Sequence, residues 1–197
     1  MSNPLNLPPP PQRLVLEVRF DVDQQTDQLS CRLYPDTMFP PEPDPNPRHG
    51  GYANSLYFTP GDQVAVRVIG GGNKVDGKPT FASFQIVDCT IVTRPQVVRR
   101  DSGVRTRYAP PSPFSQALGA SFHVPLDYSS HITANDQQYY ELTQNWKSTL
   151  DVAYCQGLWD LSMVLTVRIV HGADGADEVR VFSFDPETEV GSQGTIP

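Results

Sequence analysis

Apolar and polar residues alternate along much of this chain. Leu14, Leu16, Val18 and Phe20 are separated by residues of mixed polarity. A period of two is typical of a β-strand, because successive side chains point to opposite faces of a sheet. Strand-like runs occupy residues 14–20, 28–34, 54–58, 63–69, 81–92, 118–126, 150–154, 157–170 and 178–184.

These eight or nine runs are separated by turn residues, and no β-α-β alternation is visible. The pattern predicts an all-β fold, an antiparallel two-sheet β-sandwich of jelly-roll-like type with at most one short helix. A helix competes only at residues 133–146, where Asn135 or Asp136 would cap it. Tyr139 and Tyr140 suit a strand equally well, so both alternatives stay open there.

Three short segments carry turn chemistry. Pro60-Gly61-Asp62 has proline to preset φ and glycine to accept a positive φ. Residues 70–79, GGGNKVDGKP, combine three glycines with Asp-Gly and predict a hairpin connection. A phosphate-binding loop is not indicated there, because the G-x-x-x-x-G-K-[ST] spacing and a following helix are both missing. Residues 171–175 predict the turn of a final hairpin.

Twenty prolines in 197 residues favour short elements and long connections over long helices. Residues 1–12 predict a Pro-rich arm, and residues 13–197 predict one β-sandwich domain. Six prolines between Pro35 and Gly51 predict a rigid surface loop, with a binding loop as the alternative.

Formal net charge is −7, which gives no general attraction to nucleic acid or to anionic membranes. No run approaches the roughly 20 apolar residues of a membrane span, and the N-terminus lacks the pattern of a signal peptide. The three cysteines, Cys31, Cys89 and Cys155, form no C-x-x-C pair and are expected to be buried rather than paired. We therefore expect a cytoplasmic protein, with export by another route as the alternative.

No motif for catalysis, a metal or a cofactor is recognisable. His49, His123, His131 and His171 lack H-x-H or H-x-x-x-H spacing, and no G-x-S-x-G elbow occurs. The carboxylates that follow the first strand, Asp21, Asp23 and Asp27, lack the EF-hand pattern and are expected to form a charged turn. The sequence thus predicts no catalytic residue, no metal and no cofactor.

Weak candidates for binding are aromatic or basic. Trp146, Trp159, Tyr139 and Tyr140 are side chains that could stack on a sugar ring, although core packing is a common alternative for such residues. Arg105 and Arg107 belong to a basic island within residues 95–116 of an otherwise acidic chain. A solvated loop is the simple interpretation of this island, and self-association or anion contact is the functional one.

The order of these features resembles a known family. The GD-x-V-x-V-R run begins at Gly61, and the last hairpin closes with Phe184-Asp185-Pro186. This arrangement is similar to the bacterial AidA/PixA inclusion-body-type proteins, whose last strand carries Trp-Asp-Pro-Tyr. This chain has Phe184 in place of the Trp and Glu187 in place of the Tyr. The resemblance implies a self-associating bacterial β-sandwich and supplies no catalytic residues. In structural terms, Pro186 predicts an edge strand or a bulge, because proline donates no N–H.

Two classes of function follow. The first is a non-enzymatic, self-associating binding or assembly protein that forms homo-oligomers, with a carbohydrate-binding, lectin-like module as its variant. The second is an enzyme on a jelly-roll or cupin-like barrel, which requires a converging His/Glu cluster. The histidine spacing favours the first class.

Overall fold

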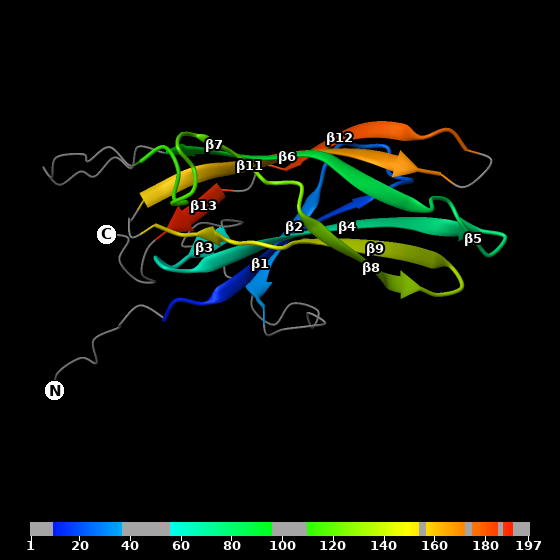
Figure 1. Ribbon diagram of the computed structural model, residues 1–197, viewed down its shortest axis with the longest axis horizontal. Helices are drawn as coiled ribbons and strands as arrows, with labels where there is room; N and C mark the ends of the chain where they lie inside the picture. The colour runs from blue at the N-terminus through cyan, green and yellow to red at the C-terminus, as the bar shows by residue number, and fades with distance from the viewer. Residues whose placement is uncertain are drawn as a thin grey trace, which may run out of the picture.

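The computed structural model describes residues 10–36, 56–95, 110–153, 157–171, 175–184 and 187–190. In these ranges the chain forms strands and turns, and no helix that could cross a membrane occurs among them. Two sheets face each other, with β6, β11 and β12 in the upper layer of Figure 1 and β4, β8 and β9 in the lower. The predicted all-β, two-sheet sandwich is therefore confirmed.

The lower layer is a seven-stranded sheet. Its order is β2 (Ser30–Pro35), β1 (Arg13–Asp21), β4 (Gln63–Val75), β9 (Tyr139–Trp146) and β8 (Tyr128–Asn135), and β5 (Lys78–Pro79) and β10 (Leu150–Asp151) pair with β4. The helix considered at residues 133–146 is wrong, because this segment forms the end of β8 and all of β9. Tyr140, Leu142 and Trp146 alternate along β9 and are buried, which is the periodicity of a strand.

The upper layer is a six-stranded sheet. Its order is β3 (Leu56–Phe58), β13 (Glu187–Val190), β11 (Gly157–Val170), β6 (Ser83–Pro95) and β7 (Ser121–His123), and β12 (Glu178–Phe184) pairs with β11. Most neighbours in both sheets are antiparallel, as predicted. The exceptions among the described strands are β1 with β4 and β3 with β13, which are parallel.

One hydrophobic core fills the space between the sheets. Alternate residues of β11, from Trp159 to Ile169, are fully buried, as are Leu14, Leu16 and Val18 of β1. Burying one such side chain stabilises a fold by about 1.5–3 kcal/mol. The core therefore fixes which face of each strand points inward, and so which residues remain for the outer faces.

The turns at residues 59–62 and 76–77 have the backbone geometry that their residue types favour. Asp62 N donates to Thr59 O at 2.9 Å, with Gly61 at a φ of 92°. The fully buried Asp62 carboxylate also accepts hydrogen bonds from the backbone N–H of Thr59 and of Gln12, both at 2.7 Å. Asp76 and Gly77 have φ values of 51° and 75°, as a two-residue hairpin turn requires.

The prediction for the three consecutive glycines is wrong in one respect. They were expected in a hairpin connection, but Gly70, Gly71 and Gly72 lie within β4, which continues to Val75. A Cβ atom on Gly70 would lie 2.7 Å from the Phe20 ring, and one on Gly71 would lie 2.0 Å from the Tyr139 hydroxyl. Glycine is needed here because aromatic side chains cross β4 closely on both faces.

Candidate functional site

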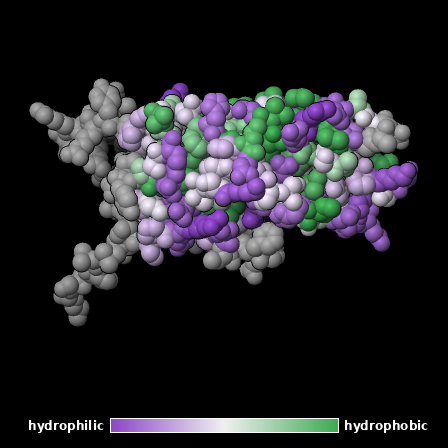
Figure 2. All heavy atoms as spheres, in the orientation of Figure 1, coloured by the Kyte–Doolittle hydropathy of each residue, from purple (hydrophilic) through white to green (hydrophobic). Residues whose placement is uncertain are grey.

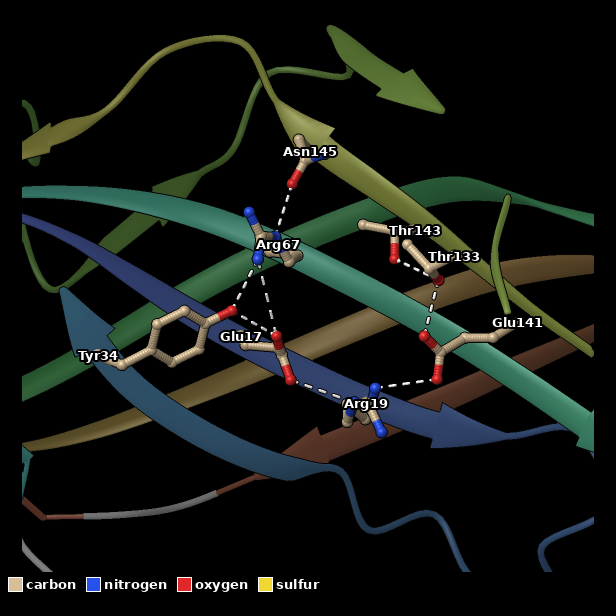
Figure 3. A network of polar contacts seen from close by, with 8 residues as sticks. All are labelled: Glu17, Arg19, Tyr34, Arg67, Thr133, Glu141, Thr143 and Asn145. Atoms are coloured by element: carbon tan, nitrogen blue, oxygen red, sulfur yellow. Dashed lines mark hydrogen bonds and ion pairs between the residues drawn. The ribbon is translucent and has the colours of Figure 1, made fainter. Parts of the chain in front are cut away.

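A network of polar side chains lies across the outer face of the seven-stranded sheet (Figure 3). Glu17 of β1 is buried and accepts a hydrogen bond from the Tyr34 hydroxyl at 2.5 Å. Arg67 of β4 donates through Nη1 to the same hydroxyl at 2.7 Å and through Nε to Asn145 Oδ1 at 2.8 Å. Burial, followed by the Glu17 carboxylate, raises the pKa of Tyr34 above its ordinary value.

The network continues through Arg19. Its Nε lies 3.1 Å from Glu17 Oε1, and its Nη2 donates to Glu141 Oε2 at 2.9 Å. Glu141 Oε1 accepts from the Thr133 hydroxyl at 2.7 Å, and Thr133 lies 3.0 Å from the Thr143 hydroxyl. Each carboxylate thus contacts an arginine and at least one hydroxyl group within the sheet.

This network cross-links strands β2, β1, β4, β9 and β8. Two glutamates face two arginines, so the charges balance within it. Removing one member would leave a buried partner unpaired, which is the costly event for such groups. The arrangement supports a structural role. The residue pattern alone did not predict this network, although Glu17 and Arg67 interrupt otherwise apolar strands.

Three of the four aromatic binding candidates are buried in the core. Trp159 is fully buried and its Nε1 donates to Pro110 O at 2.9 Å. Trp146 is buried against Phe122, with ring centroids 6.1 Å apart. Tyr140 is buried, with its ring centroid 5.3 Å from that of Phe81. These rings offer no face on which a sugar could stack.

Tyr139 alone among these aromatics lies on the outer face. Its ring crosses Gly71, and its hydroxyl donates to Asp21 Oδ2 at 3.0 Å. Burial, followed by the Asp21 carboxylate, raises the pKa of Tyr139 to about 12. The phenol is therefore engaged within the fold rather than presented to a ligand.

The described histidines do not converge. His123 lies beside Thr90 and Asp88 on β6, His171 contacts Thr80 and Glu178, and His131 lies on β8. His49 lies outside the described residues. Within the described ranges, no three His, Cys, Asp or Glu side chains are grouped so that they could hold a metal ion.

Several other predictions fall wholly or partly on residues that the structure does not describe. Arg105 and Arg107 lie outside the described ranges, as do Cys155 and most of the Pro-rich arm. Cys31 and Cys89 are unpaired thiols, and burial raises the pKa of Cys89 to about 12.

The family motif falls at an interruption between two strands. Phe184 is buried at the end of β12. Asp185 and Pro186 lie outside the described residues, but β12 ends just before them and β13 begins just after them. Both strands pair with β11, at Met163–Ile169 and Gly157–Asp160 respectively. The predicted place of Pro186 on an edge strand or at a bulge stays a prediction, because Pro186 lies outside the described residues.

Strand β12 has an edge that is open over most of its length. Ser183 N donates to Asp27 O and Leu29 N donates to Ser183 O, both at 2.8 Å, on the side away from β11. Alternate residues of a strand direct their backbone groups to the same side, so those of Val179 and Val181 also point away from β11. No backbone partner within the described part of the chain reaches these two valines.

Exposed valines lie on the outer face of the sheet beside this edge, where Thr166 and Arg168 of β11 pair with Val181 and Val179. Val179 and Val181 are 63% and 54% exposed, and Val164 of β11 and Val87 of β6 are 37% and 47% exposed. Val87 lies at a β-bulge next to Thr166, which pairs with Val181 on its other side. Figure 2 shows hydrophobic atoms gathered over β6 and β12. We call Val87, Val164, Val179 and Val181 the valine patch.

The opposite sheet ends on an edge of different character. Strand β8 pairs only with β9 among the described strands, and its exposed residues include Ser129, Ser130 and His131. A β-bulge lies between Ile132 and Ala134. Bulges and polar side chains are devices that prevent edge strands from pairing with other chains. Strand β12 has no bulge between Glu178 and Phe182, and the two charged residues of this stretch, Glu178 and Arg180, lie 3.7 Å apart.

Comparison of the chain with protein-family models, with curated proteins and with solved structures gives no match. The similarity to AidA/PixA proteins therefore stays a prediction.

Proposed function

We propose that this chain is a non-enzymatic, self-associating β-sandwich protein, of the kind that the AidA/PixA resemblance implies. The observation that carries the proposal is the open edge of β12, bordered by the valine patch. Unpaired N–H and C=O groups form a template for another strand. Exposed valines on the same strand add apolar area that association removes from water.

Contiguous apolar surface next to an open edge is uncommon on proteins that remain monomeric, because it invites association. The other functions have less support. A carbohydrate-binding module needs exposed rings, whereas Trp146 and Trp159 are buried. A cupin-like enzyme needs a converging His/Glu cluster, and the described histidines lie on separate elements.

Size-exclusion chromatography with light scattering over a dilution series tests the proposal. We expect the full chain to form an oligomer that dissociates on dilution, and Val181→Lys to weaken association by roughly 10-fold or more. Fully burying an exposed valine is worth about 1.5–3 kcal/mol; Val181 is 54% exposed, so about half of this value is available in each of the two copies that associate.

The matched control is Ile132→Lys, at a residue on the β8 edge with 55% exposure against 54% for Val181. It adds the same charge to an edge that carries a bulge, so it should leave the oligomer unchanged. A monomeric full chain at every concentration would refute the proposal, and so would equal effects of the two lysines.

A further inference from the structure

The open edge of β12 has defined ends. At one end, residues 27–29 occupy the outer side of Ser183 through two backbone hydrogen bonds. At the other end, β12 begins at Glu178. An added strand can therefore pair only between Glu178 and Phe182, where the outward backbone groups belong to Val179 and Val181.

We propose that this edge, if the proposed self-association holds, binds the β12 strand of a second copy about a two-fold axis beside Arg180, with Val179 of each copy opposite Val181 of the other. In an antiparallel pair, residues that exchange N–H···O bonds in both directions alternate with residues that do not. This register makes both valines of each copy such exchanging residues, so every outward backbone group meets a partner.

The two neighbouring registers are excluded by the backbone bonds of Ser183 and by the start of β12. An axis beside Val181 would place Val179 opposite Ser183 of the second copy, whose backbone groups are already bonded to Asp27 and Leu29. An axis beside Val179 would place Val181 opposite Asp177, which precedes the strand. The length of the free edge thus selects the register centred on Arg180.

The charges near the axis are balanced within each copy. Arg180 donates to Val22 O at 2.9 Å and to Gln24 O at 2.8 Å, and its guanidinium lies 4.8 Å from the Phe182 ring centroid. Glu178 lies 3.7 Å from Arg180 Nε. The Arg180 side chains of the two copies meet near the axis, and the hydrogen bonds and the ion pair of each are made within its own chain.

On the outer face, the same register joins the two valine patches. Val179 and Val181 point outward from β12, so each contacts its counterpart across the new strand pair. The six-stranded sheets of the two copies become continuous. Because both copies use the same edge, the interface is closed and yields a dimer rather than a fibre.

Disulfide trapping tests the register in the full-length chain. Directly opposed residues of such pairs have Cα atoms about 5.5 Å apart, within the range that a disulfide spans. Four samples are oxidised in a glutathione buffer: Val179→Cys alone, Val181→Cys alone, an equilibrated mixture of these two variants, and the double variant. Cleavage after Arg180 places the two sites in different peptides, so mass spectrometry identifies each bond.

We expect the 179–181 disulfide in the mixture and the double variant, with at least about tenfold less 179–179 or 181–181 product in the single variants. Ile132→Cys on the β8 edge should give no intermolecular bond. Light scattering first establishes whether the chain is oligomeric. If it is, a dominant 181–181 or 179–179 bond, or the absence of any bond, would overturn this register and leave the proposed function standing. A monomeric wild-type chain would overturn both.

Discussion

Substitution of Gly70 by alanine tests the packing of β4 most sharply. The added Cβ would lie 2.7 Å from Phe20 Cζ and 2.8 Å from two atoms of the Phe84 ring. Comfortable carbon contacts lie at about 3.5–4.0 Å, so each ring would have to retreat by at least roughly 0.7 Å. Phe20 has little room to move, because its ring also stacks on Phe182 with centroids 4.8 Å apart, and Phe84 packs edge-on against Phe20 with centroids 5.1 Å apart.

The expected loss can be estimated from these contacts. Forcing one extra carbon into a packed core costs about 1–3 kcal/mol. Replacing glycine by alanine also restricts the unfolded chain, which offsets about 0.4–1 kcal/mol. We therefore expect the free energy of unfolding to fall by about 1–2 kcal/mol in Gly70→Ala.

Urea unfolding measures this change, with Gly119→Ala as the control. A Cβ atom on Gly119 would meet nothing within 4 Å, so the control keeps the unfolded-state effect without the clash. The midpoint of Gly70→Ala should fall while its m-value stays unchanged. Equal stability of the two variants would contradict this estimate. So would an undiminished cost of Gly70→Ala in a Phe84→Leu background, which removes one of the two rings that oppose the added Cβ.

Three further predictions concern single residues. Gly77→Ala should lower the free energy of unfolding by about 1 kcal/mol, because the φ of 75° is unfavourable for alanine although space is open; an unchanged urea midpoint would contradict this. Cys89, whose pKa burial raises to about 12, should resist iodoacetamide at mildly alkaline pH until the chain unfolds; a label found on Cys89 itself by mass spectrometry of the native protein would contradict this. Tyr139 should ionise near pH 12 rather than 10, so its contribution to stability is complete below pH 10 and lost as the pH rises to about 12. Comparison of phenolate absorbance between the wild type and Tyr139→Phe checks this midpoint, and a value near 10 would exclude the burial effect.

Most strands were predictable because their inward residues repeat every second position. Leu14 to Phe20 and the long run of β11 follow this rule, and both face the core. Pro60-Gly61-Asp62 was equally readable, since its turn depends on local backbone preferences alone.

The glycines of β4 were misassigned for a physical reason. Glycine is common in turns, and nothing near Gly70–Gly72 in the sequence reveals the rings that cross them. Those rings come from Phe20, Phe84 and Tyr139, which only the tertiary fold brings together. Local propensity and tertiary packing gave opposite answers, and packing determined the structure.

The open edge could not be predicted either. The sequence of β12 shows alternating valines, but which side of a strand remains unpaired depends on the order of strands in the sheet. The order became clear only from the pairing of β12 with β11 and of Ser183 with residues 27–29. The burial of Trp146 and Trp159 likewise depends on which face of each strand packs against the other sheet, and their residue type alone does not determine this.

Amide hydrogen exchange at Val179 and Val181 is the decisive measurement of self-association through β12, because these are the N–H groups that association would cover. We predict that exchange at both residues slows as the protein concentration rises, while exchange at Ser130 and Ile132 on β8 does not change. Exchange at Val179 and Val181 that is fast and independent of concentration would contradict self-association through β12.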